Sequence, residues 1–204
     1  MNTVIVNNQP VTPSKIICIG RNYVDHIHEL GNEIPDDMVV FFKPNSAISD
    51  QLHSKHLQEP LHFEGELCFV YQQGKFTAVG FGLDLTKRGL QSRLKTKGLP
   101  WERAKAFNGS ALFSDFVAID SIDDDLSLTL TINGELQQAG GVSLMMYKPA
   151  EILAELQTFI TLEDGDIVMT GTPKGVGIIK KADTFCGKIM QNNKPLITKQ
   201  WQAK

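Results

Sequence analysis

Three carboxylates in two strand-like segments are the residues of this chain best suited to chemistry. Glu64 and Glu66 lie in HFEGELCFV, and Asp84 lies in VGFGLDLTKR. Alternation along a strand puts Glu64 and Glu66 on one face, and apolar neighbours on both faces indicate burial rather than a solvated edge. Hard carboxylate oxygens suit Mg²⁺ or Mn²⁺, with positions left for water or substrate. We expect Gly80 and Gly82 to leave open space beside Asp84 for that purpose.

A second candidate pair lies near the N-terminus. His26 and Glu29 are three residues apart in a predicted helix, which places them on one helix face within reach of each other. A carboxylate that holds one imidazole nitrogen leaves the other free to take a proton from water. A surface ion pair is the alternative interpretation.

Length and composition bound the class of protein. With 204 residues, 42% of them hydrophobic, the chain is expected to form a single domain over residues 1–204 with one core. A net charge of −3 argues against partners such as nucleic acid or an anionic membrane. A group of basic residues is interpreted as a solvated helix face: Lys87, Arg88, Arg93, Lys95 and Lys97.

Cysteine usage and the termini indicate the compartment. Cys18, Cys68 and Cys186 are odd in number, far apart and in apolar surroundings, which predicts reduced thiols and favours a cytoplasmic location. The segment MNTVIVNNQPVTPSK has no charged start followed by an apolar stretch, and no run approaches transmembrane length. We therefore expect neither export nor membrane insertion.

The hydrophobic pattern predicts a mainly β (α+β) fold with a few short helices. Strands are expected at residues 15–19, 39–42, 62–70, 126–132 and 167–172, and helices at 21–30, 86–97 and 149–159. Gly31 and Gly98 are helix stops, and Asn133-Gly134 predicts a tight hairpin. The helix at 86–97 places Arg88 and Gln91 about one turn apart.

The order of several motifs resembles the fumarylacetoacetate hydrolase family, in particular its small acylpyruvase and oxaloacetate decarboxylase members. The motifs are IGRNYVDHIHELG, FFKPNSAI, HFEGEL, GLDLTKRGLQ, LPWERAKAF, NGELQQ and ITLEDGDIVMTGTPKGVG. The resemblance implies a catalytic domain of mixed β-roll or sandwich type, a homodimer, and Mg²⁺ or Mn²⁺ bound by Glu64, Glu66 and Asp84. The Gly-rich GTPKGVG lacks the spacing of a phosphate-binding loop.

The resemblance also implies roles for other residues. His26 and Glu29 are expected on a lid helix, where they position a hydrolytic water, and Lys105 is expected to reach substrate oxygens or the leaving enolate. The substrate-binding residues are Arg21, Lys43, Arg88, Gln91 and Thr172, the last through its hydroxyl and backbone N–H. Two departures from the family pattern, Gly89 and Asn108, stand where relatives carry Asp.

The implied activity is metal-dependent cleavage of a C–C bond in a small anionic β-dicarbonyl 2-oxo acid. A bound metal orients such a substrate and acts as a Lewis acid. Hydrolysis of an acylpyruvate and decarboxylation of oxaloacetate are both compatible with it. The first alternative is a fumarylpyruvate or fumarylacetoacetate hydrolase, or an isomerase, of aromatic catabolism. The second is a catalytically weak metal-binding protein that serves as a structural or regulatory dimer.

Overall fold

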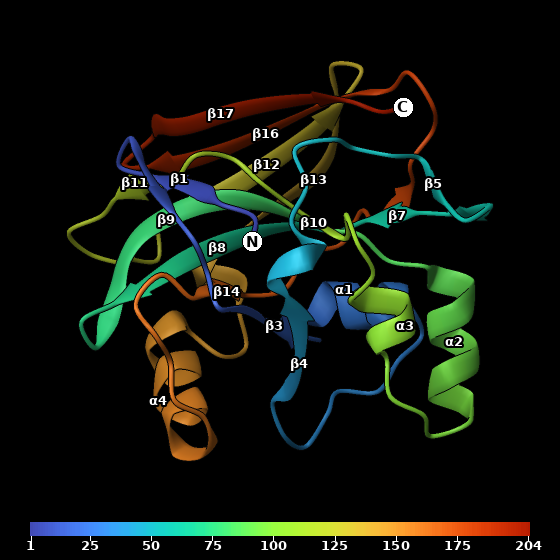
Figure 1. Cartoon of the computed structure of the whole chain (residues 1–204), viewed down its shortest axis with the longest axis horizontal. Helices are drawn as coiled ribbons and strands as arrows, with labels where there is room; N and C mark the ends of the chain where they lie inside the picture. The colour runs from blue at the N-terminus through green and yellow to red at the C-terminus, as the bar shows by residue number, and fades with distance from the viewer.

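The computed structural model describes residues 1–204, and the predicted mainly β fold is confirmed (Figure 1). The larger sheet has the strand order β10-β9-β8-β14-β3-β4, and β11 pairs with β9. Its strands are β3 (Lys15–Gly20), β4 (Val39–Pro44), β8 (Gly65–Gln72), β9 (Lys75–Asp84), β10 (Ala111–Phe113), β11 (Val117–Ala118) and β14 (Ile167–Met169). The strands β3 and β14 are parallel neighbours, so the sheet is mixed.

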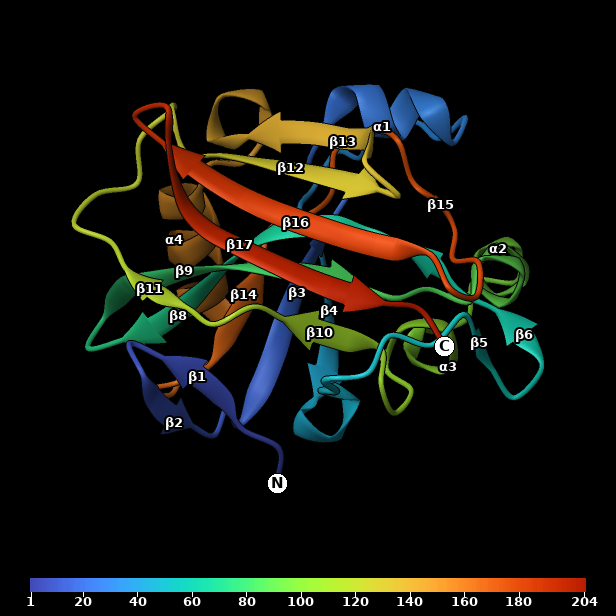
Figure 2. The same ribbon diagram turned by 90° about the horizontal axis from the view of Figure 1, so that it is seen from above.

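A four-stranded sheet, β13-β12-β16-β17, lies over one face of the larger sheet (Figures 1 and 2). Its strands are β12 (Ser127–Ile132), β13 (Glu135–Gly141), β16 (Thr184–Gln191) and β17 (Lys194–Gln202). The predicted hairpin is confirmed, because Asn133 and Gly134 both have positive φ, at 54° and 87°. Those angles are typical of the two-residue turns that match strand twist.

Short two-stranded pairs complete the β structure. They are β1 (Val4–Val6) with β2 (Gln9–Val11), β5 (Lys55–His56) with β6 (Glu59–Pro60), and β7 (His62–Phe63) with β15 (Gly177–Ile178). Two 3₁₀ turns, η1 (Asn45–Ala47) and η2 (Val142–Leu144), follow β4 and β13. The strand expected at 62–70 is thus interrupted at Glu64, between β7 and β8.

Four short helices lie outside the sheets: α1 (Val24–Glu29), α2 (Arg88–Thr96), α3 (Glu102–Lys105) and α4 (Pro149–Phe159). Helices α2 and α3 lie together, whereas α4 lies at the opposite end of the molecule (Figures 1 and 2). None of the helices has the length and apolar character needed to cross a membrane.

The helix expected at 21–30 begins only at Val24. Arg21 has a φ of 55°, which an α-helix does not accommodate, and the side chain of Asn22 donates to the carbonyl oxygen of Thr170 at 2.9 Å. These contacts tie the residues before the helix to the strand ends. The stops predicted at Gly31 and Gly98 are confirmed by φ values of 61° and 62°.

The main core fills the space between the two sheets. Glycines let the sheets approach closely there: a Cβ at Gly187 of β16 would lie 2.5 Å from the ring of Phe81 on β9. A second, smaller core lies on the other face of the larger sheet, where the N-terminal hairpin packs over Cys18 and Cys68. Both thiols are buried and free, as predicted.

The interpretation of Gly80 and Gly82 as open space is wrong. A Cβ at Gly80 would lie 2.6 Å from the Phe116 ring, and one at Gly82 would lie 2.4 Å from the sulfur of Cys68. Core side chains therefore occupy the room that these glycines leave. Their absent side chains serve packing of the smaller core, and the approach to Asp84 is from elsewhere.

Gly187→Ala should lower stability by about 1–3 kcal/mol, because the new methyl group collides with the fixed Phe81 ring. In thermal unfolding this corresponds to a fall of about 2–4 °C for each kcal/mol. Gly89→Ala is the matched control, since Gly89 lies in α2 with open space around its Cβ position. The control should be neutral or slightly stabilising. Equal melting temperatures for the two variants would contradict this account of sheet packing.

Candidate active site

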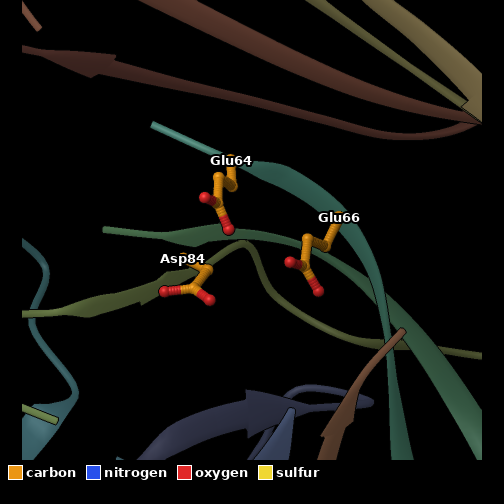
Figure 3. Close-up of side chains that lie close together, drawn as sticks. All are labelled: Glu64, Glu66 and Asp84. Atoms are coloured by element: carbon orange, nitrogen blue, oxygen red, sulfur yellow. The ribbon is translucent and has the colours of Figure 1, made fainter. Parts of the chain in front are cut away.

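The structure brings the three predicted carboxylates together, and their side chains lie close to one another (Figure 3). Glu64 lies between β7 and β8, Glu66 lies in β8, and Asp84 ends β9. One oxygen from each of the three lies within 4.8 Å of the others. The backbone N–H of Asp84 donates to the carbonyl oxygen of Glu64 at 2.9 Å, which fixes the two strand ends. All three carboxylates are buried.

Lys105, at the end of α3, supplies the central positive charge of this cluster. Its Nζ lies 2.7 Å from Glu64 Oε2, 2.8 Å from Asp84 Oδ2 and 2.7 Å from Thr86 Oγ1. Burial by itself would lower the pKa of Lys105, but the charges of Asp84 and Glu64 outweigh burial and raise it. The ammonium has all three N–H groups engaged, so in this conformation it has no donor left for a substrate.

Two further cations complete the ion pairs. Arg88 Nη2 contacts Glu64 Oε1 at 2.5 Å, and its Nη1 donates to Gln91 Oε1 at 2.9 Å. Burial would raise the pKa of Glu64, but the charges of Lys105 and Arg88 hold it well below its ordinary range. Lys43 Nζ lies 2.9 Å from Asp84 Oδ1. The predicted proximity of Arg88 and Gln91 is confirmed.

Glu66 is the carboxylate without a cation. Its Oε2 accepts the backbone N–H of Gly171 at 2.8 Å, and no ammonium or guanidinium contacts it. Burial, followed by the charges of Asp84 and Glu64, raises its pKa well above the ordinary value. Asp84 Oδ1 is buried and receives no hydrogen bond, because Lys43 approaches it outside hydrogen-bonding geometry.

These observations fit a divalent cation. The donors are hard oxygens, Glu66 lacks a counter-charge, and Asp84 Oδ1 lacks a hydrogen bond. Lys105 contacts one oxygen of Glu64 and one of Asp84, so its ammonium competes with such a cation for the same carboxylates. With a divalent cation present, three carboxylates and three contacting cations would leave roughly two positive charges in excess, which suits an anionic substrate.

The His26 and Glu29 side chains make the predicted contact. His26 Nδ1 lies 3.0 Å from Glu29 Oε2, while Glu29 Oε1 accepts the backbone N–H of Gly175 at 2.9 Å. His26 is buried at the wall of the pocket that contains the carboxylates. Its Nε2 makes no hydrogen bond within the chain. The arrangement leaves one ring nitrogen available for proton transfer in the pocket.

Thr172 lines the same pocket, but its hydroxyl is already engaged. Thr172 Oγ1 donates to the carbonyl oxygen of Gly65 at 2.9 Å and accepts from Gln138 Nε2 at 2.8 Å. The expectation that this hydroxyl holds a substrate carboxylate is therefore not met in this conformation. The backbone N–H of Thr172 makes no hydrogen bond within the chain, and it remains the available donor.

The other predicted substrate-binding residues occupy different positions. Arg21 lines the pocket, whereas Lys43 does not. The Lys43 ammonium is fully buried and donates to the carbonyl oxygen of Lys105 and to Ser110 Oγ. Its contacts hold the polypeptide behind the site. The departures at Gly89 and Asn108 both lie at exposed positions, and the contacts of Arg88 with Glu64 and Gln91 are intact without them.

Sequence reasoning misplaced one charged residue of the pocket. Lys95 was interpreted as part of a solvated basic face, but it lines the pocket, with its Nζ 4.6 Å from the centroid of the Trp101 ring. Lys87 is buried and Arg88 and Lys95 are partly buried, so only Arg93 and Lys97 of that group are exposed. The available signal was spacing, because Lys95 follows Arg88 by seven residues and Gln91 by four, on one helix face.

The complete pocket wall draws on α1, α2, α3 and the strand ends. Its residues are Ile19, Gly20, Arg21, His26, Ile27, Leu30, Asn32, Phe41, Glu64, Glu66, Asp84, Arg88, Gln91, Lys95, Trp101, Lys105, Gly171 and Thr172.

The chain is similar in sequence to known proteins. The family model described as fumarylacetoacetate (FAA) hydrolase C-terminal matches residues 15–198. Oxaloacetate tautomerase YcgM of Escherichia coli is 35% identical over 193 residues, covering 83% of this chain and 85% of the relative. The human mitochondrial oxaloacetate tautomerase FAHD1 is 38% identical over 184 residues, with coverage of 82% and 83%.

Solved structures share the fold. A proposed fumarylacetoacetate isomerase/hydrolase from Oleispira antarctica superposes with a TM-score of 0.94 at 32% identity, covering 100% of both chains. The fumarylpyruvate hydrolase of Pseudomonas aeruginosa, solved in complex with Mn²⁺ and pyruvate, gives a TM-score of 0.88 at 26% identity, with coverage of 99% of this chain and 95% of that one.

Glu66→Gln should stabilise the metal-free protein at neutral pH by about 1 kcal/mol or more. The folded-state pKa of Glu66 lies above its ordinary value of 4.5, so this group costs wild-type stability as the pH rises above that value. The amide removes the cost and keeps an acceptor for Gly171. Thermal unfolding with a chelator should show a gain at pH 7 that disappears near pH 4.

The same variant should lose most of the stabilisation by metal. Mn²⁺ should raise the melting temperature of the wild type, by mass action on the folded state, and should have little effect on Glu66→Gln. A variant less stable than wild type at pH 7 without metal would contradict the assignment of Glu66 as the uncompensated carboxylate.

Proposed function

The chain belongs to the fumarylacetoacetate hydrolase family, and from this premise we propose that it is a Mg²⁺- or Mn²⁺-dependent enzyme of small β-dicarbonyl 2-oxo acids. The proposed main reaction is the keto–enol tautomerisation of oxaloacetate. The names of the E. coli and human relatives support that choice. The observation that carries the proposal is one pocket lined both by three buried carboxylates and by His26, which has a free ring nitrogen.

Glu64, Glu66 and Asp84 would hold the metal. When bound, it would supply Lewis-acid polarisation of the 2-oxo group and charge neutralisation for an enolate. Lys105 and Arg88 keep Glu64 ionised, because both place positive charge against its oxygens. These cations therefore maintain the Glu64 carboxylate in its charged form.

Other groups of the chain would bind and orient the substrate. Gln91 and Thr172 both line the pocket that the 2-oxo acid would enter, and the Nε2 of Gln91 and the backbone N–H of Thr172 lack partners in the chain. Arg88 fixes the orientation of the Gln91 amide by donating to its Oε1 at 2.9 Å. The carboxylate of the substrate thus meets fixed donors, which limits the orientations it can adopt.

His26 would carry the proton transfer. Glu29 holds Nδ1, so Nε2 is the nitrogen that takes a proton from C3 of the oxo acid while negative charge moves to the 2-oxo oxygen. The imidazolium then returns the proton either to C3 or to the oxygen, which interconverts the keto and enol forms. Glu29 stabilises the transient positive charge on the ring.

The cleavage of a C–C bond is the second candidate function. The same free Nε2 of His26 would serve to activate water for attack on the acyl group of an acylpyruvate or fumarylpyruvate. The similarity to a P. aeruginosa fumarylpyruvate hydrolase supports this alternative. Decarboxylation of oxaloacetate would need the enolate stabilisation but no water-activating base.

Two further expectations stay predictions. A homodimer is expected from the family resemblance, and a cytoplasmic location from cysteine usage. The human relative is named as a mitochondrial protein, so fractionation of the source cells is the relevant test of location.

A substrate and metal panel tests the proposed function. Purified protein treated with a chelator should be inactive, and Mg²⁺ or Mn²⁺ should restore the conversion of enol to keto oxaloacetate. The loss of absorbance of the enol form measures this conversion. Acetylpyruvate and fumarylpyruvate, assayed in parallel, test the cleavage alternative. Full activity in the chelator, or no activity on any of these acids with either metal, would refute the proposal.

His26→Ala should separate reactions that need a base from one that does not. We expect tautomerisation and hydrolysis to fall by about two to four orders of magnitude, the usual effect of losing a general base, and decarboxylation of oxaloacetate to fall less. His28→Ala on the same helix is the control, because His28 is exposed and lies off the pocket wall. If the rates of all three reactions fell by the same factor, the result would argue against a proton-transfer role for His26.

A further inference from the structure

Two positive side chains at the pocket lack the carboxylate partners that the other cations have. Lys95 makes no ion pair or hydrogen bond, and its Nζ lies against the face of the Trp101 ring. The Nε of Arg21 is buried without a partner, and its Nη2 makes one long contact of 3.3 Å, with Asn32 Oδ1. Both side chains line the same pocket as the carboxylate cluster.

The position of Lys95 along α2 gives the pocket a direction. Arg88, Gln91 and Lys95 are spaced by three and four residues, so they share one helix face, and all three line the pocket. Arg88, at one end, contacts Glu64. Lys95 lies two turns farther along, about 10 Å of helix axis away. One end of the pocket is therefore formed by the carboxylates, and the other by unpaired positive charge.

This positive end is energetically unfavourable without an anion. Burial, followed by the charges of Arg21 and Arg88, lowers the pKa of Lys95 to about 8. The ammonium is still mostly protonated at neutral pH, and no carboxylate of the chain forms an ion pair with it; Glu64, which opposes the lowering, is already in contact with Arg88 and Lys105. A favourable charge at the C-terminus of a helix does not account for its position, because exposed Lys97 would serve that purpose equally well.

We propose that Lys95, together with Arg21, forms a subsite for a second carboxylate of the substrate, so that Lys95 selects dicarboxylic over monocarboxylic 2-oxo acids. The 2-oxo carboxylate would lie at Glu64, Glu66 and Asp84, and the distal carboxylate would lie at the Lys95 ammonium. This inference rests on the proposed function, since it requires a 2-oxo acid at the carboxylate cluster. The inference adds to that function the residue that determines which class of 2-oxo acid is bound.

Turnover of a matched pair of substrates tests the subsite. Oxaloacetate carries the second carboxylate, and acetylpyruvate carries a methyl ketone in its place. In Lys95→Met the ratio of kcat/KM for oxaloacetate to that for acetylpyruvate should fall tenfold or more, mainly through a higher KM for oxaloacetate. Lys95→Arg should restore most of the ratio. Lys97→Met, the same change at an exposed position of the helix end, should leave it at the wild-type value.

A binding measurement keeps the test independent of turnover. Malate and lactate are unreactive 2-hydroxy acids that differ by one carboxylate. Malate should raise the melting temperature of the Mg²⁺-loaded wild type more than lactate does, and Lys95→Met should abolish this difference. If Lys95→Met does not fold, Lys95→Gln takes its place, with circular dichroism as the check on folding.

The outcomes separate the two proposals. Suppose that the wild type turns over 2-oxo acids, and that Lys95→Met keeps both the kcat/KM ratio of oxaloacetate to acetylpyruvate and the preference for malate over lactate. That result overturns the subsite and leaves the proposed function standing. A wild type without turnover of either acid overturns the proposed function. In that case a malate preference that depends on Lys95 supports the anion subsite, and its absence overturns the subsite as well.

Discussion

Burying three carboxylates within 4.8 Å of one another is the constraint on which the arrangement of this site depends. Each negative charge would be costly in the protein interior without compensation. Lys105 and Lys43 compensate Asp84, and Lys105 with Arg88 compensates Glu64, but Glu66 receives only a backbone N–H. The short helices α2 and α3 carry Arg88 and Lys105, and their position beside the larger sheet brings these cations into contact with Glu64 and Asp84 (Figure 1).

The same compensation explains how the site would treat an anionic substrate. Cations already outnumber the carboxylates on the walls and behind them, and a divalent ion at Glu66 would increase the positive excess. An anion entering the pocket therefore encounters donors and charges that the fold has fixed beforehand, at little cost in reorganisation. The proposed proton-transfer group, His26, is oriented by Glu29, and both residues lie on α1, apart from the helices that carry the cations. Binding and proton transfer thus come from different elements of the structure.

Local sequence signals predicted most of the fold, and they failed where tertiary packing decided the outcome. Asn133-Gly134, Gly98 and the helix at Pro149–Phe159 follow from turn chemistry, helix stops and periodicity. Clustering of the carboxylates followed from strand alternation and the family motifs. Sequence could not show that the space beside Gly80 and Gly82 is filled, because the side chains that fill it belong to Phe116 and Cys68, which lie in other parts of the chain. The pocket position of Lys95 was missed for a related reason: a basic helix face looks solvated until Trp101 and the sheet end are placed against it.

The central claim is that the buried carboxylates form the binding site of a divalent cation in competition with Lys105. Anomalous diffraction from crystals grown with Mn²⁺ tests this most directly. The account predicts one anomalous peak per chain at about 2.1 Å from oxygens of Glu64, Glu66 and Asp84, with the Lys105 ammonium withdrawn from at least one of the two carboxylates it contacts here. A saturating Mn²⁺ concentration that leaves no peak at these oxygens, with Lys105 still in contact with both Glu64 and Asp84, would contradict it.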